Sequence, residues 1–121
     1  MILVDTSVWI DHLRRSEPDL VALLEGDEVM AHPFVTGELA CGTIRNRDEI
    51  LGLLRRLPAA PVATHCETLE FIGQRSLMGR GVGFIDVHLL AAVALSGTAR
   101  LWTKDKQLSS LAARLNLEYT A

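Results

Sequence analysis

Four acidic residues stand where a carboxylate could take part in chemistry. Asp5 directly follows the apolar run Ile2–Val4, and Asp105 comes shortly after a second apolar run. Such runs are typical of buried strands in a parallel sheet, whose ligands collect beyond the carboxyl ends of the strands. Glu38 and Asp86 lie in two segments with helical spacing, one or two turns from apolar residues. This spacing predicts that both side chains face inward.

Four converging carboxylates indicate a divalent cation. Without a cation they would repel each other and be costly to desolvate, so some would have to bind protons. Oxygen ligands with no nearby His or Cys cluster favour Mg²⁺, with Mn²⁺ as the alternative, over zinc. Such an ion polarises a phosphoryl oxygen and lowers the pKa of an attacking water. The predicted chemistry is therefore hydrolysis of a phosphodiester.

Each acid also has a structural explanation. Asp is a favoured residue at helix N-termini, so Asp5, Asp86 and Asp105 could each cap a helix. Glu38 could lie at the rim of a solvated helix face. The hydroxyl groups of the residues that follow Asp5 fit either role, because they could cap a helix and also steady the carboxylate.

Strands and helices alternate along the chain and must position these acids. We expect strands at 1–4, 28–32, 61–63, 100–103 and 117–119, and helices at 7–15, 18–25, 33–42, 48–57, 64–78, 87–96 and 105–115. Two helix starts carry specific signals, a cap at Ser16 and a capping box formed by Thr64 and Glu67. The alternation predicts an α/β fold with a small parallel sheet of four to five strands flanked by helices.

The composition is that of an ordered protein with a single domain over residues 1–121. Apolar residues make up 49% of the chain and charged residues 22%. The longest apolar run is too short to span a membrane, and no signal sequence is present, so we expect a cytoplasmic protein without a membrane partner. The net charge of −3 argues only weakly against a nucleic-acid partner. If the four acids bind a metal, the rest of the chain is slightly positive.

The other reactive side chains have structural explanations. The four histidines are scattered, and none has a second histidine at ligand spacing, so packing or surface roles are expected. Trp9 and Trp102 lie in apolar settings that are typical of a core, although single-strand binders stack bases on such rings. Cys41 and Cys66 are far apart in the sequence and are expected to be reduced and mostly buried.

Four segments of the chain resemble the signature blocks of PIN-domain ribonucleases. They are residues 2–8 (ILVDTSV), 36–42 (TGELACG), 84–92 (FIDVHLLAA) and 101–108 (LWTKDKQL). Their order and spacing, and the length of the chain, are similar to those of the VapC toxins of bacterial toxin–antitoxin pairs. One departure is His88 and the two leucines after it, which replace a commoner Ile-Ala-Ala and affect packing rather than the acids.

The resemblance implies a PIN-like three-layer sandwich and a Mg²⁺- or Mn²⁺-dependent endoribonuclease. It further implies a homodimer and a small antitoxin protein that blocks the acidic cleft. By this likeness Asp5, Glu38, Asp86 and Asp105 are the catalytic, metal-binding quartet, with Asp5 and Asp86 as the direct metal ligands. The supporting hydroxyl groups are those of Thr6, Ser7 and Thr103.

Three basic residues are the first candidates for contacts with RNA phosphates, and they are Arg80, Lys104 and Lys106. Two other functions stay open. The chain could be a catalytically weak module that binds a partner or regulates transcription, or it could be a small Mg²⁺-dependent phosphatase.

Overall fold

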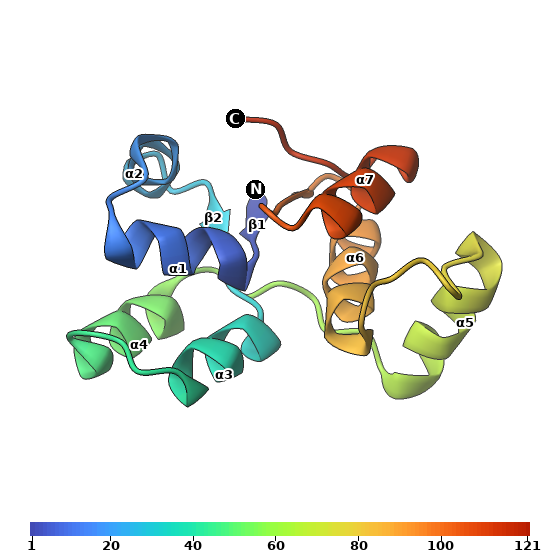
Figure 1. Cartoon of the computed structure of the whole chain (residues 1–121), viewed down its shortest axis with the longest axis horizontal. Coiled ribbons are helices and arrows are strands. Elements are labelled where there is room, and N and C mark those ends of the chain that lie inside the picture. Colours follow the sequence, from blue (N-terminus) through green and yellow to red (C-terminus); the bar gives the residue numbers. More distant parts are fainter.

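Three short strands and seven helices make up the structure, a computed structural model that describes residues 1–121. In chain order they are β1 (Ile2–Val4), α1 (Thr6–Arg14), α2 (Pro18–Glu25), β2 (Val29–Met30), α3 (Pro33–Cys41), α4 (Arg47–Arg56), α5 (His65–Arg75), α6 (Phe84–Ser96), β3 (Arg100–Trp102) and α7 (Lys106–Arg114). Figure 1 shows α1–α4 on one side of the strands and α5–α7 on the other. None of the helices is both long and apolar enough to span a bilayer.

The sheet is parallel throughout, with β1 at its centre and the order β2-β1-β3. Leu3 pairs with Met30 on one side and with Leu101 on the other. Helices enclose the sheet, which explains why its strands are continuous apolar runs rather than alternating ones. The backbone N–H of Asp5 donates to the carbonyl of Trp102 at 2.9 Å, so the pairing of β1 with β3 continues up to the first acid.

The α/β class is confirmed, but the sheet has three strands rather than four or five. Two more segments meet it only through single bridges, Ala31–Ala59 and Leu101–Glu118. The strand predicted at 61–63 is wrong, because the pairing occurs earlier, at Ala59. Pro61 has no N–H with which to continue a ladder.

The capping box predicted for α5 is confirmed. Thr64 Oγ1 accepts from the N–H of Glu67 at 3.1 Å, and Glu67 Oε1 accepts from the N–H of Thr64 at 2.8 Å. The helix ends at Arg75 instead of reaching Met78. It stops there because Ser76 adopts a left-handed conformation with φ of 55°.

Two helices start at residues other than the predicted ones. Helix α6 begins at Phe84, before Asp86, and its N-cap is Gly83. The carboxylate of Asp86 still serves this helix terminus, because its third position lets the side chain reach back to the N-cap N–H. In α2 the N-cap is Glu17, not Ser16, and no side chain caps the helix.

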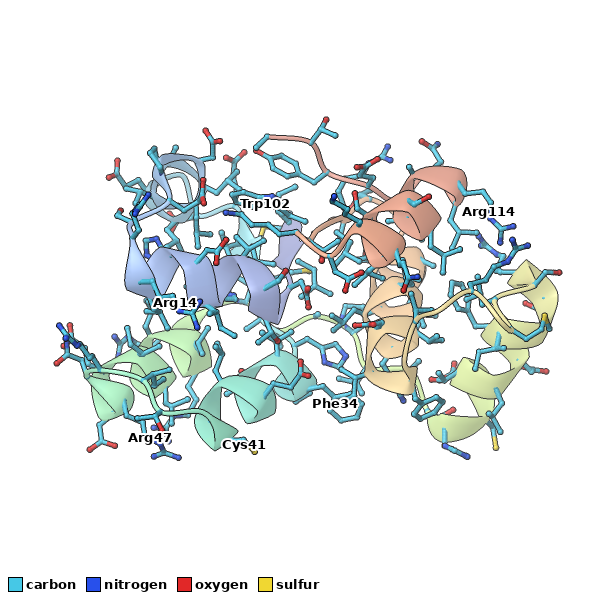
Figure 2. The ribbon with its side chains drawn as sticks, viewed as in Figure 1. Arg14, Phe34, Cys41, Arg47, Trp102 and Arg114 are labelled. Carbon is cyan, nitrogen blue, oxygen red and sulfur yellow. The ribbon has the colours of Figure 1, made fainter.

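The core is built around α6, whose residues 87–93 are all buried. Trp9 and Trp102 are 1% and 7% exposed, so their assignment to the core is confirmed. Both cysteines are free thiols as predicted, but Cys41 and Cys66 are exposed, and the expectation that they are buried is wrong. They lie near helix ends, and Figure 2 shows Cys41 at the outer end of α3.

His32 is a fully buried polar side chain at the start of α3. Its Nδ1 accepts a hydrogen bond from the N–H of Phe34 at 3.1 Å, so the neutral ring carries its proton on Nε2, which has no partner. The Phe34 ring lies between α3 and α6 and contacts His88, with 4.7 Å between the ring centroids (Figure 2). Burial, reinforced by His88, lowers the pKa of His32 to about 4.

Acid should therefore destabilise the fold through His32. In the unfolded chain this imidazole titrates near 6.5, so the stability conferred by the neutral ring is complete above that pH and is lost as the pH falls towards 4. Between about pH 7.5 and pH 5 the loss from this group is about 2 kcal/mol. His32→Asn keeps a side-chain acceptor for Phe34 but cannot titrate. Urea unfolding at both pH values should show that this variant loses less stability at the lower pH than the wild type does. Equal losses of stability would contradict the assignment.

Candidate active site

Asp5 lies at the carboxyl end of the central strand, with only 6% of its surface exposed. It occupies the N-cap position of α1, but its side chain makes no capping hydrogen bond. Instead Oδ2 accepts from Ser7 Oγ at 2.8 Å and from Thr103 Oγ1 at 2.7 Å. The carboxylate is thus held by one hydroxyl group from the first turn of α1 and one from the connection between β3 and α7.

The two hydroxyl groups are fixed in direction by backbone donors. Ser7 Oγ accepts from the N–H of Lys104 at 3.0 Å, and Thr103 Oγ1 accepts from the N–H of Asp105 at 3.1 Å. Since each hydroxyl has one hydrogen and gives it to Asp5, the 3.3 Å approach of Ser7 to Thr103 is a contact and not a further hydrogen bond. Asp5 Oδ1 has no such partner and is not among the buried unpaired atoms, so it keeps some contact with solvent.

Glu38 reaches the same region from α3. Thr6 Oγ1 donates to Glu38 Oε1 at 2.7 Å, which joins the start of α1 to α3. Glu38 is exposed, so the prediction that it faces inward on the apolar stripe is wrong. Its helix packs against α1, and the carboxylate lies beside the first turn of α1 rather than in the core.

Asp86 is the half-buried acid of the four, and its pKa is affected by the charges of the other three. Its Oδ2 accepts from the N–H of Gly83 at 3.3 Å. Burial raises the pKa of Asp86, and the negative charges of Asp5, Asp105 and Glu38 raise it further, against the lowering effect of the Gly83 hydrogen bond. The four acids therefore share one electrostatic environment.

Asp105 caps a helix, and its charge also acts on Asp86. It is the N-cap of α7, and its Oδ1 accepts from the N–H of Leu108 at 2.9 Å. Its own N–H donates to Thr103, as described above, so the cap and the Asp5 network share a connection. The capping and catalytic interpretations of this residue are compatible.

No basic side chain lies within 4 Å of any of the four carboxylates. Lys104 is adjacent in sequence to Asp105, but its ammonium group pairs with Glu17 and with Asp11. These two hydrogen bonds raise the pKa of Lys104. Of the other predicted phosphate contacts, Arg80 and Lys106 line one groove beside α7.

A family model described as PIN domain matches residues 2–114, which include all four acids. The chain belongs to the PIN-domain family. Two proteins named Ribonuclease VapC32, from the CDC 1551 / Oshkosh and ATCC 25618 / H37Rv strains of Mycobacterium tuberculosis, are each 55% identical to this PIN domain over 113 residues. The match covers 93% of this chain and 91% of each relative. The resemblance to VapC-type PIN domains is confirmed.

In this PIN domain no three His, Cys, Asp or Glu side chains are grouped closely enough to hold a metal ion as they stand. The chemistry of the donors fits a hard divalent cation, because all four groups are carboxylates and none is neutralised by a basic partner. A common ion would require movement of side chains, and Glu38 and Asp105 are both exposed, each held by one hydrogen bond, from Thr6 and from the N–H of Leu108.

Two features of this PIN domain's site and its surroundings escaped sequence reasoning. The N–H of Gly83 is a donor to Asp86, and the three-residue spacing between them was the available signal. Arg114 joins Arg80 and Lys106 in lining the groove. Its signal was the repeat of polar residues at 106, 110 and 114, which places them on one face of α7.

The mutual repulsion of the acids can be measured in metal-free protein. Asp5→Asn should lower the pKa of Asp86, because it removes a negative neighbour that disfavours ionisation. Glu38→Gln, at an exposed position, should act in the same direction without touching the Asp5 network. NMR titration of the Asp86 carboxyl carbon measures the effect. Glu49→Gln, on the exposed surface of α4, is the control and should leave the titration unchanged. An Asp86 pKa unaffected by both Asp5→Asn and Glu38→Gln would disprove the shared environment.

Proposed function

We propose that this protein is a divalent-metal-dependent endoribonuclease and the toxin of a toxin–antitoxin pair. The observation that carries the proposal is the shared environment of four carboxylates, centred on the buried Asp5 and uncompensated by any basic residue. The similarity to relatives named Ribonuclease VapC32 supports RNA as the substrate.

The proposed metal ligands are Asp5 and Asp86, with Glu38 and Asp105 completing the acidic quartet. Mg²⁺ is the proposed ion and Mn²⁺ the alternative, since oxygen ligands suit both. When bound, such an ion supplies a polarised phosphoryl oxygen and an activated water. Support for Asp5 as a ligand comes from Oδ1, which keeps some contact with solvent and has no hydrogen bond, while Oδ2 accepts both hydroxyl hydrogen bonds.

The supporting hydroxyl groups orient the acids in this proposal. Ser7 and Thr103 hold one oxygen of Asp5, which directs the other oxygen outward. Thr6 steadies Glu38, the most mobile type of side chain in the quartet, by a hydrogen bond from the start of α1. The residues thus reduce the freedom of carboxylates that would otherwise turn away from one another.

A groove of about 530 Å³ beside Glu38 supports an antitoxin partner. Helices α1 and α3 and the connection after α3 form it. Its apolar lining residues are Ile10, Leu13, Leu39 and Ile44, and its basic ones are Arg14 and Arg45. We propose that an apolar and acidic segment of the antitoxin binds there and covers the acidic site.

The homodimer belongs to the same proposal. Helices α5 and α6 carry three exposed apolar side chains, Leu69 (51% exposed), Ile85 (37%) and Leu95 (52%). These side chains offer a surface for a second copy. The RNA substrate and the cytoplasmic location complete the proposal.

Removing a proposed ligand should abolish cleavage of RNA. Asp5→Asn or Asp86→Asn should slow Mg²⁺-dependent cleavage by more than about 100-fold, because even an outer partner of a metal ligand contributes roughly 10–100-fold. Asp48→Asn, at an exposed position in the first turn of α4, is the matched control. Full activity in either variant would reject the acidic site. Hydrolysis of a phosphomonoester but not of RNA would indicate a phosphatase, and no hydrolysis with Mn²⁺ would favour a regulatory module.

Metal binding should also be visible without any substrate. Mn²⁺ at about 100 times its Kd should stabilise the wild-type fold by about 2.7 kcal/mol, because it binds only the folded site. The increase in Tm should vanish in Asp86→Asn and persist in Asp48→Asn. A Tm that Mn²⁺ raises equally in all three proteins would place the ion elsewhere.

A further inference from the structure

A second groove, of about 320 Å³, lies between α7 and the connection from α5 to α6. Its lining residues are Arg80, Lys106, Gln107, Ser110, Leu111 and Arg114. Three of them are basic, two are neutral side chains that can donate hydrogen bonds, and none is acidic. The groove is therefore a locally positive surface on a chain whose net charge is −3.

Backbone contacts hold both arginines of this groove in place. Arg80 Nε donates to the carbonyl of Ser76 at 3.2 Å, and Arg114 Nη2 donates to the carbonyl of Arg75 at 3.1 Å. Figure 2 shows Arg114 extending from α7 towards α5. Each guanidinium group has five N–H donors, so most remain available after these contacts. No carboxylate pairs with either group, in contrast to Lys104.

The connection that carries Arg80 is pressed against α7 at a glycine. Gly81 has φ of +78°, and a Cβ at this position would lie 2.7 Å from the Gln107 side chain. Glycine adopts this left-handed conformation without strain, and a larger residue would also have to displace the flexible end of Gln107. This contact places Arg80, the preceding residue, beside the basic face of α7.

The groove begins next to the acidic site. Lys106 directly follows Asp105, and Ser110 and Arg114 repeat at intervals of four residues along the same face of α7. From Lys106 to Arg114 the helix rises about 12 Å, which is enough to accompany more than one phosphate of a nucleic-acid strand.

We propose that this groove binds the backbone phosphates of the RNA substrate next to the position of cleavage. The inference rests on the proposed nuclease function. An acidic quartet repels a polyanion, so the strand needs basic contacts outside the quartet, and Lys104 is occupied by Asp11 and Glu17. Phosphate contacts carry no base information, so the groove positions the strand without selecting its sequence.

Binding of a fluorescein-labelled single-stranded RNA, measured in EDTA to prevent cleavage, tests the groove separately from catalysis. Lys106→Gln and Arg114→Gln should each raise the Kd several-fold to about tenfold. Each should also reduce the slope of log K against log salt concentration by about 0.7, the value for one phosphate contact on a single strand. Lys106 makes no side-chain hydrogen bond within the chain, so its variant reports on RNA even if Arg114→Gln disturbs the fold.

Arg55→Gln is the matched control, because Arg55 is also an exposed arginine whose Nε donates to a carbonyl, that of Leu51, and it lies outside the groove. In a cleavage assay with Mg²⁺, the groove variants should raise KM and leave kcat close to that of the wild type. An unchanged Kd and salt slope in both groove variants would overturn the inference and leave an acidic protein segment as the occupant to test. A wild-type protein that binds RNA through the groove but does not cleave it would reject the nuclease function and keep the groove.

Discussion

The structure depends on how a single buried carboxylate is satisfied. Burying a charged group costs free energy unless hydrogen bonds replace those it made to water. In Asp5, Oδ2 accepts two hydrogen bonds, both from hydroxyl groups. Ser7 lies in the first turn of α1, directly after β1, and Thr103 lies in the connection after β3. The pairing of the two strands continues into these hydrogen bonds, so the register of the sheet and the orientation of Asp5 are set together.

The four carboxylates in the same region repel one another without a compensating positive charge. Asp86 is harder to ionise because of its burial and its three acidic neighbours, and no basic side chain offsets them. Lys104, which adjoins Asp105 in the sequence, pairs with Asp11 and Glu17 instead. The repulsion is confined to one place, beside a core of 25 buried apolar residues, and such perturbed carboxylates are typical of functional sites.

The sequence predicted those features that depend on interactions between residues close together in the chain. The strand at Ile2–Val4, the capping box at Thr64 and the cap at Asp105 follow from apolar runs and from hydrogen bonds within a few residues. Helical spacing failed for Glu38, because it describes a face of one helix and not which neighbour covers it, and here the neighbour is the start of α1.

Long-range partners stayed beyond the reach of the sequence for the same reason. The start of α6 was misplaced for a local reason: the helix begins at Phe84 with Gly83 as its N-cap, and Asp86 satisfies a backbone donor from the third position rather than from the expected position at the helix start. The contact of Arg114 with the carbonyl of Arg75 joins residues 39 positions apart, and only the packing of α7 on the end of α5 creates it.

The link between Asp5 and Thr103 spans 98 positions of the chain, so the site has consequences for the order of folding. During synthesis β1 emerges first, and its central position in the sheet remains open on one side until β3 has been made. A nascent chain without β3 lacks the Thr103 hydroxyl, Asp105 and the whole of α7. Non-local pairings of this kind form late and slowly. A ribosome-bound fragment of this protein therefore carries the first acid long before it has a complete acidic site, which keeps any hydrolytic activity from appearing before β3 and the start of α7 have been made.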